Sequence, residues 1–135
     1  ALMTMNISRD EDRPAGPAPA ENFTGDAMIK PLFQASEASN TVASQVTFPP
    51  SARNAWHSHP AGQALVVTAG SGWVQEWGGP KQEVTVGDVI WTAPGVKHWH
   101  GATSSETMTH IAIQDSVEGV TVDWFDKVDD EDYLR

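Results

Sequence analysis

The sequence contains no cysteine among its 135 residues, and this absence excludes several kinds of chemistry. Without thiols the chain has no disulfide framework, no cysteine nucleophile and no thiolate ligand for a metal. A metal site in this protein would therefore use imidazole, amide or carboxylate groups, and such groups favour the harder metal ions.

Basic residues are also scarce, with 8 lysines and arginines against 18 aspartates and glutamates, so the formal net charge is −10. Nucleic acids and anionic membrane surfaces would be repelled, and we expect neither as a partner. No apolar run approaches the roughly 20 residues that span a membrane, and no signal-peptide segment is recognisable. We therefore expect a cytoplasmic protein whose partner is a small molecule.

The length fits one domain with a genuine core. Residues 8–22 mix charged side chains with three prolines and show no apolar period. We therefore predict a flexible N-terminal arm over 1–22 that carries no chemistry, followed by a single domain over 23–135.

Short apolar or β-branched runs separated by glycine and proline turns make up most of the chain after residue 23. The strands predicted from these runs are 27–33, 41–48, 64–69, 73–77, 83–86, 89–92, 98–102 and 107–114. Gly70 and Gly72 predict a hairpin between the third and fourth of them. So many short strands indicate an all-β sandwich or barrel, and we favour a jelly roll.

The C-terminal stretch differs from the rest of the chain. Four consecutive acidic residues, 129–132, precede Tyr133 and Leu134. Because acidic side chains suit the first turn of a helix, we predict a short C-terminal helix, with a solvated acidic tail as the alternative.

Four of the five histidines form two pairs in which the members are two residues apart. His57 and His59 are the first pair, His98 and His100 the second, and His110 stands alone. Side chains two apart in a strand point to the same face, so each pair can present two imidazoles together.

Gln63 can join the first pair after a bend at Pro60 and Gly62. Two imidazoles with another donor close by are typical of a divalent metal site. The alternative for His57 and His59 alone is a pair of histidines on a solvated strand.

The two pairs stand in motifs that resemble those of the cupins, small jelly-roll barrels with a metal site. The first motif is matched at Ser51, His57, His59, Gln63 and Gly70, with Ser51 where cupins carry glycine and Gln63 where they carry glutamate. The second is matched at Gly87, Gly95 and His98, with the proline displaced to Pro94 and Ala102 where asparagine is usual. The resemblance implies an all-β cupin barrel or sandwich that holds a metal, and a cupin that has lost its metal is the alternative.

Segments 56–60, 94–102 and 108–114 are similar to small bacterial cupins that include manganese-dependent hydroxynitrile lyases. This resemblance implies a divalent metal, with Mn expected first and Fe, Ni, Co or Zn as alternatives. It also implies a homodimer or homotetramer. The metal ligands implied are His57, His59, Gln63 and His98. His100 and His110 are implied in catalysis, the alternative being buried histidines bonded to a neighbour.

The amide of Gln63 in place of a carboxylate leaves the charge of a divalent ion uncompensated, which raises its Lewis acidity and disfavours a trivalent state. This favours a redox-neutral lyase over an oxygenase. The resemblance then implies a lyase that cleaves or forms cyanohydrins, with the metal as Lewis acid and histidine as acid or base. A metal-dependent dioxygenase of a small organic substrate and a non-catalytic ligand-binding cupin are the alternatives.

Alternation along 41–48 and 107–114 places several side chains on the face of the histidines. An apolar lining there would suit an aromatic or alkyl aldehyde product. The residues we expect to line the substrate pocket are Val42, Ser44, Val46, Phe48, Leu65 and Gln114. Ordinary core packing is the alternative for each of them.

Overall fold

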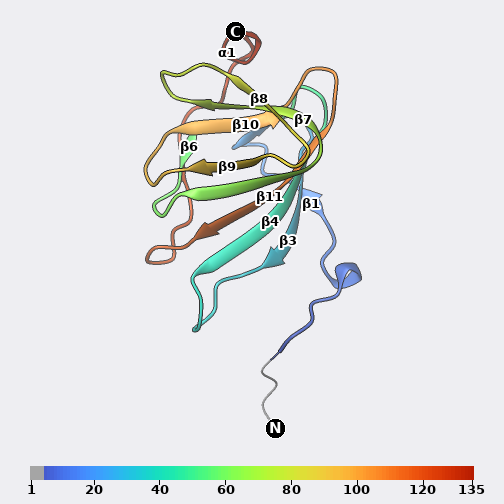
Figure 1. The fold of residues 1–135 in the computed structure, drawn as a ribbon, viewed down its shortest axis with the longest axis vertical. Coiled ribbons are helices and arrows are strands. Elements are labelled where there is room, and N and C mark those ends of the chain that lie inside the picture. The colour runs from blue at the N-terminus through green and yellow to red at the C-terminus, as the bar shows by residue number, and fades with distance from the viewer. Residues whose placement is uncertain (1–4) are drawn as a thin grey trace.

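The longest strand, β7 (Gln63–Glu76), belongs to two β-sheets and joins them. In the computed structural model, which describes residues 5–135, the first part of β7 pairs with β9 (Val89–Thr92) and β11 (Met108–Asp115). Its second part pairs with β8 (Gln82–Thr85) and β10 (His98–Ala102). All of these pairings are antiparallel, and the two sheets curl toward each other around a common interior (Figure 1).

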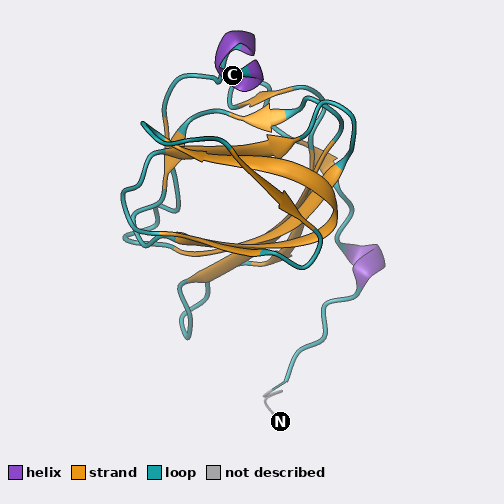
Figure 2. Cartoon of the chain, turned by 45° about the horizontal axis from the view of Figure 1, so that its top comes forward, coloured by secondary structure: helices purple, strands orange, loops and turns teal. Residues whose placement is uncertain are grey.

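The remaining strands extend both sheets. The first sheet has the order β1 (Gly16–Pro17), β3 (Met28–Phe33), β4 (Thr41–Phe48), β11, β7, β9. The second has the order β2 (Phe23–Thr24), β5 (Arg53–Asn54), β10, β7, β8, with β6 (His57–Ser58) beside β10 and β12 (Asp123–Trp124) beside β6. Figure 2 shows the barrel that the strands enclose, and the prediction of an all-β fold is confirmed.

The hairpin predicted between 64–69 and 73–77 is wrong, because β7 runs through both segments without reversing. Gly70 has a φ of +71°, and a Cβ atom there would collide with the carbonyl of Thr107. The pairing register between β7 and β11 also shifts at Thr109 and His110. Glycine and the register shift therefore bend the strand from one sheet into the other, as bulges do at barrel corners.

The predicted C-terminal helix is present as α1 (Asp130–Leu134), and Asp129 caps it by accepting a hydrogen bond from the Asp132 backbone N–H at 2.8 Å. The hydroxyl of Tyr133 donates to the carbonyl of Ala102 at 2.6 Å, which docks the helix on the outer face of β10. Trp99 is fully buried beneath this cover. Strand β10 is therefore enclosed on both faces.

The segment before β2 lies against the first sheet. It includes a short 3-10 helix, η1 (Asp10–Asp12), and β1 pairs with β3. Arg13 donates to the carbonyl of Pro31 at 2.8 Å, and Lys30 donates to the carbonyl of Arg13 at 2.7 Å. The division into an arm over 1–22 and a domain over 23–135 stays a prediction, and residues 1–4 of that arm lie outside the described residues.

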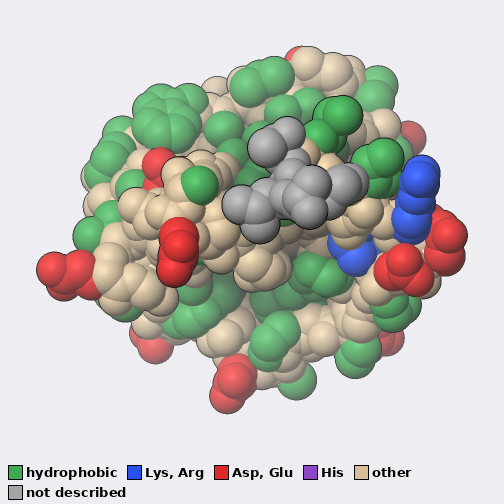
Figure 3. Space-filling model, turned by 90° about the horizontal axis from the view of Figure 1, so that it is seen from below, with side chains coloured by type: hydrophobic (Ala, Val, Ile, Leu, Met, Phe, Trp, Pro, Cys, Tyr) green, Lys and Arg blue, Asp and Glu red, His purple; other side chains and the backbone are tan. Residues whose placement is uncertain are grey.

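The surface reflects the acidic composition. On the face drawn in Figure 3, hydrophobic side chains are interspersed with polar ones, and the lysine and arginine side chains in view lie on one side.

Within residues 5–135, no helix is long and apolar enough to cross a membrane.

Candidate metal centre

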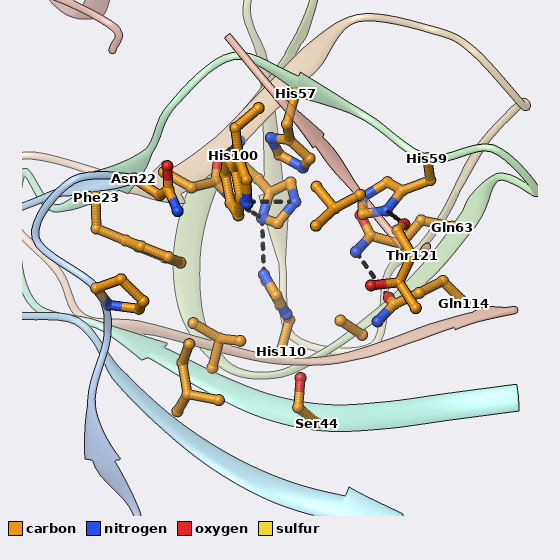
Figure 4. Close-up of a pocket in the computed structure, with 17 residues that line it drawn as sticks. Asn22, Phe23, Ser44, His57, His59, Gln63, His100, His110, Gln114 and Thr121 are labelled. Atoms are coloured by element: carbon orange, nitrogen blue, oxygen red, sulfur yellow. Dashed lines mark hydrogen bonds between the residues drawn. The ribbon is translucent and has the colours of Figure 1, made fainter. Parts of the chain in front are cut away.

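The fold brings all five histidines and Gln63 into one buried cluster inside the barrel. Figure 4 shows His57, His59, His100, His110 and Gln63 of this cluster. Each of these side chains is at most 5% exposed. His57 lies on β6, His98 and His100 on β10, His110 on β11 and Gln63 at the start of β7, while His59 follows β6. The ring centroids of His57 and His98 are 4.3 Å apart, and those of His57 and His59 are 5.0 Å apart.

Three of the histidines are oriented in the same way by the backbone. The Nδ1 atom of His57 lies 2.8 Å from the carbonyl oxygen of Ala55, and that of His98 lies 2.9 Å from the carbonyl oxygen of Val96. The Nδ1 atom of His59 lies 2.7 Å from the carbonyl oxygen of Thr121. A carbonyl oxygen can only accept, so each Nδ1 carries the proton and each Nε2 presents a lone pair.

The Nε2 lone pair of His59 is the one that most clearly calls for a ligand. Its Nε2 atom is buried and makes no hydrogen bond with any residue that the structure describes. Such an atom is costly to leave unpaired in the interior unless something binds it. Together with the orientation of the other rings, it fits a divalent metal ion.

Gln63 is oriented by a second glutamine. Its Nε2 atom donates to Oε1 of Gln114 at 3.1 Å, and its Oε1 atom lies 3.4 Å from Nε2 of His98. The amide oxygen, which is the donor that a hard ion prefers, is therefore directed toward the imidazoles.

His100 and His110 have different surroundings. Nδ1 of His100 lies 2.9 Å from Nε2 of His110, and both rings pack against the ring of Phe48. The side-chain oxygen of Asn54 accepts a hydrogen bond from the backbone N–H of His100, and its amide nitrogen contacts the His100 ring. Neither Nδ1 atom of this pair is bonded to a backbone carbonyl among the described residues.

Burial keeps the cluster neutral. Desolvation lowers the pKa of His98 and of His110 to about 4, and it lowers the pKa of His59 as well. Desolvation and, to a lesser extent, the neighbouring imidazoles lower the pKa of His57 and His100 well below the ordinary value. Neutral imidazoles offer lone pairs to a metal or a proton at neutral pH.

One ring nitrogen from each of His57, His98 and His100 lies within 4.8 Å of the other two. The geometry therefore offers two overlapping sets of donors, one with His59 and Gln63 and one with His100. Both sets contain His57 and His98.

A cavity of about 200 Å³ opens beside the cluster. The side chains that line it include no lysine, arginine, aspartate or glutamate among the described residues. The lining residues are Pro19, Asn22, Phe23, Ile29, Ser44, Val46, Asn54, His57, His59, Gln63, His100, His110, Ala112, Gln114, Thr121, Val122 and Trp124.

Ser44, Val46 and Gln114 of the expected pocket line this cavity, whereas Val42, Phe48 and Leu65 do not. Phe48 and Leu65 are at most 1% exposed, because their side chains are packed on every side. Alternation gives the face of a strand that a side chain occupies, but not whether that side chain reaches empty space.

Sequence reasoning missed the part of the lining that comes from irregular segments. Asn54 lies on a strand of only two residues, and Trp124 comes from a short strand near the C-terminus. Asn22 and Pro19 belong to the segment that we expected to carry no chemistry. Only the Trp-Phe dipeptide at 124–125 offered a signal, since aromatic side chains are common in binding pockets.

The chain belongs to the cupin family, because residues 44–114 match the family model described as a cupin domain. It is 50% identical over 131 residues to an (R)-mandelonitrile lyase from Granulicella tundricola, and the alignment covers 97% of this chain and 100% of that protein. A cupin-like protein from Thermotoga maritima is 38% identical with a TM-score of 0.83, covering 96% of this chain and 95% of that one.

A more distant structure shows the fold alone. The polyketide cyclase RemF from Streptomyces resistomycificus is 16% identical with a TM-score of 0.75, covering 96% of this chain and 91% of that one. The family and the histidine cluster together indicate a divalent metal in this site.

Proposed function

We propose that the protein is a metal-dependent lyase that cleaves a cyanohydrin to a carbonyl compound and hydrogen cyanide, or forms it in reverse. The observation that carries this proposal is the 50% identity to an (R)-mandelonitrile lyase over the whole of that protein. The neutral, buried histidine cluster beside a cavity without charged side chains supports it, since a small uncharged substrate would fit there.

We propose His57, His59, Gln63 and His98 as the metal ligands. In all three rings Nδ1 is held by a backbone carbonyl. The Nε2 atom of His59, which has no partner among residues 5–135, and the Oε1 atom of Gln63, which points toward the imidazoles, complete the set. When bound, the divalent ion would supply Lewis-acid polarisation of a substrate oxygen. Mn is our proposal for the metal, because the set joins an oxygen donor to imidazoles and contains no thiolate, and Fe, Ni, Co and Zn are tested beside it.

The His100–His110 pair supplies the proton transfer in this proposal. The hydroxyl proton of the cyanohydrin passes to an imidazole nitrogen as the bond between carbon and cyanide breaks, and the proton then passes to the departing cyanide. Atoms and charge balance, since the products are the carbonyl compound and hydrogen cyanide. The 2.9 Å contact between the two rings lets each one stabilise the protonation state of the other.

Ser44, Val46 and Gln114 are the expected pocket residues that we propose as contacts for the substrate, together with Phe23 and Trp124. The two aromatic rings lie 5.9 Å apart between their centroids at the cavity wall. An aromatic or alkyl side chain of the substrate would pack against them. A homodimer or homotetramer stays a prediction.

Cyanide release from mandelonitrile tests the proposal. We expect protein loaded with Mn²⁺ to release cyanide faster than the spontaneous reaction, and chelated protein to lose this rate and regain it when Mn²⁺ is returned. Parallel samples with Fe²⁺, Co²⁺, Ni²⁺ and Zn²⁺ identify the active ion. The absence of any metal-dependent rate would contradict the proposal, and oxygen uptake by the Fe²⁺ form without cyanide release would indicate a dioxygenase.

A further inference from the structure

Three aromatic rings gather around one ammonium group outside the cavity. Lys97, in the loop before β10, places its Nζ atom 3.6 Å from the ring centroid of Trp77 and 5.1 Å from that of Phe125. The ring of Trp56 is the third, at 5.9 Å. The rings of Trp56 and Trp77 also meet edge to face, with their centroids 4.8 Å apart. All three rings therefore lie within the distance at which a cation is attracted to an aromatic face.

The side chain of Lys97 is directed at these rings although the chain contains 18 acidic residues. Lys97 is half-buried, and none of the ion pairs between residues 5–135 includes it. Its backbone carbonyl accepts from the backbone N–H of Trp77 at 2.8 Å, which fixes the loop to the end of β7. The ammonium therefore serves the rings, and these come from three segments that are far apart in the sequence.

Phe125 belongs to residues 121–126, a segment that we call the strap because it runs along one wall of the cavity. Thr121, Val122 and Trp124 of the strap line the cavity. The ring of Trp124 lies 5.0 Å from that of His57 between centroids. The next residue, Phe125, contacts Lys97 instead of the cavity. The strap therefore presents one aromatic ring to the cavity and the following ring to the ammonium.

Apart from the contact with Lys97, the strap is held mainly by its backbone. Strand β12 has two residues and pairs with β6, and the backbone N–H of Phe125 donates to the carbonyl of Trp56 at 2.8 Å. Residues 123–127 are exposed. Because a segment with so little burial opens more easily than the core, each side-chain contact counts. We propose that Lys97 is a positioning residue whose ammonium fastens the strap to the barrel and so fixes Trp124 at the cavity wall.

Lys97→Met tests the inference, because it removes the charge and keeps an unbranched apolar side chain. Hydrogen exchange of the full chain, followed by mass spectrometry on peptides that cover 121–126, measures how often the strap opens. We expect exchange to be about 2- to 5-fold faster, the range that a cation–π contact at an exposed site corresponds to. Lys97→Arg should restore the wild-type rate, because a guanidinium also stacks on aromatic faces. Lys127→Met is the control, since it removes the same charge at an exposed lysine and should leave the rate unchanged.

Phe125→Leu provides a second variant, at a side chain that is 49% exposed. It keeps an apolar group on the strap but removes the aromatic face, so we expect faster exchange of 121–126 here as well. Added to Lys97→Met, it should increase the rate by less than it does in the wild type, because the two side chains act through the same contact.

The kinetic consequence rests on the proposed lyase function. Mandelonitrile carries an aromatic ring that would pack against Trp124, whereas acetone cyanohydrin carries none. We therefore expect Lys97→Met to raise KM for mandelonitrile by about 2- to 5-fold, to leave KM for acetone cyanohydrin unchanged and to alter kcat little for either substrate. A general loss of stability would not change the ratio of the two KM values.

Exchange of 121–126 in Lys97→Met equal to that of the wild type would overturn the fastening of the strap. Failure of Lys97→Arg to restore the rate would overturn the role of the charge. An equal rise of KM for both substrates would overturn the positioning of Trp124. The exchange measurement requires no turnover, so failure of the lyase proposal leaves the test of the strap decisive. If Lys97→Met does not fold, as judged by circular dichroism, the exchange of Phe125→Leu decides.

Discussion

The two histidine pairs have the same spacing in the sequence but different surroundings in the fold. In the first pair, His57 and His59 both place Nδ1 on a backbone carbonyl. In the second pair only His98 does so, and His100 turns the equivalent atom toward His110. The hydrogen bond made by Nδ1 therefore separates three rings suited to bind a metal from one suited to pass a proton.

This difference teaches that a shared strand face is not enough to assign a role. His98 and His100 both point inward from β10 and are equally buried. What differs is the partner that each ring finds: the loop before β10 offers His98 the carbonyl of Val96, whereas β5 and β11 offer His100 side chains.

The largest expected effect comes from removing His59, and the comparison is with removal of His100. We expect His59→Ala to lose the bound metal and all turnover above the spontaneous rate, because a ligand is removed. His100→Ala should retain metal and lose turnover only. Elemental analysis of both variants, purified in parallel, measures the difference. Metal loss in His100→Ala with metal retained in His59→Ala would favour the donor set of His57, His98 and His100 instead.

A large loss of rate is also expected from His110→Ala. Removing a general acid or base costs about 10²- to 10⁴-fold in rate. The Nε2 atom of His110 lies 2.9 Å from Nδ1 of His100, so its removal would also leave His100 without this partner. Initial rates of cyanide release at saturating mandelonitrile measure this effect, with metal content as the internal check. Turnover equal to the wild type would remove His110 from the proton-transfer pair while leaving the metal site unaffected.

A smaller effect is expected from Gln63→Glu. The carboxylate would offset part of the metal charge and so weaken Lewis acidity, and it could not donate to Oε1 of Gln114. We expect metal to be retained and kcat to fall about 10-fold, a magnitude typical of changes around a metal ligand. Gln34→Glu makes the same charge change at an exposed residue and is the matched control. A higher kcat in Gln63→Glu would show that the neutral amide is not what promotes the reaction.

The smallest effect is expected on the outer face of β10, opposite both histidines of the second pair. Tyr133→Phe removes the 2.6 Å hydrogen bond to the Ala102 carbonyl and should lower the free energy of unfolding by about 1 kcal/mol, measured with urea. Turnover should not change, since the inner face of β10 is untouched. Leu134→Ala, at a side chain that is 72% exposed, should leave stability unaltered. A loss of turnover in Tyr133→Phe would mean that the two faces of β10 are coupled.

The spacing of residues along the strands was sufficient to predict which histidines share a strand face, whereas their convergence on one site was implied by the resemblance to the cupins. The spacing of two residues placed His57 with His59 and His98 with His100, and alternation placed His110 and Gln114 on one face of β11. The fold class followed from the same periodic runs. Each of these inferences needs only the local geometry of a strand.

The features that could not be predicted depend on contacts between distant segments. Asn54 reaches His100 across 46 residues of sequence, and Trp124 meets the ring of His57 with centroids 5.0 Å apart. No local period marks such residues. Gly70 misled the prediction for a related reason, since the same glycine conformation serves a reversal or a bend, and only the pairing of β7 with β11 decides between them.

The continuous path of β7 also ties the stability of one sheet to that of the other. A hairpin at 70–72 would have let either sheet open while the other stayed intact. Instead, the first part of β7 is hydrogen-bonded to β11 and its second part to β10. Opening one sheet therefore pulls on the strand that also holds the other sheet. The backbone amides near the middle of β7 should then exchange their hydrogens only when the whole barrel unfolds, so that the proposed metal ligands and the His100–His110 pair share one cooperative unit.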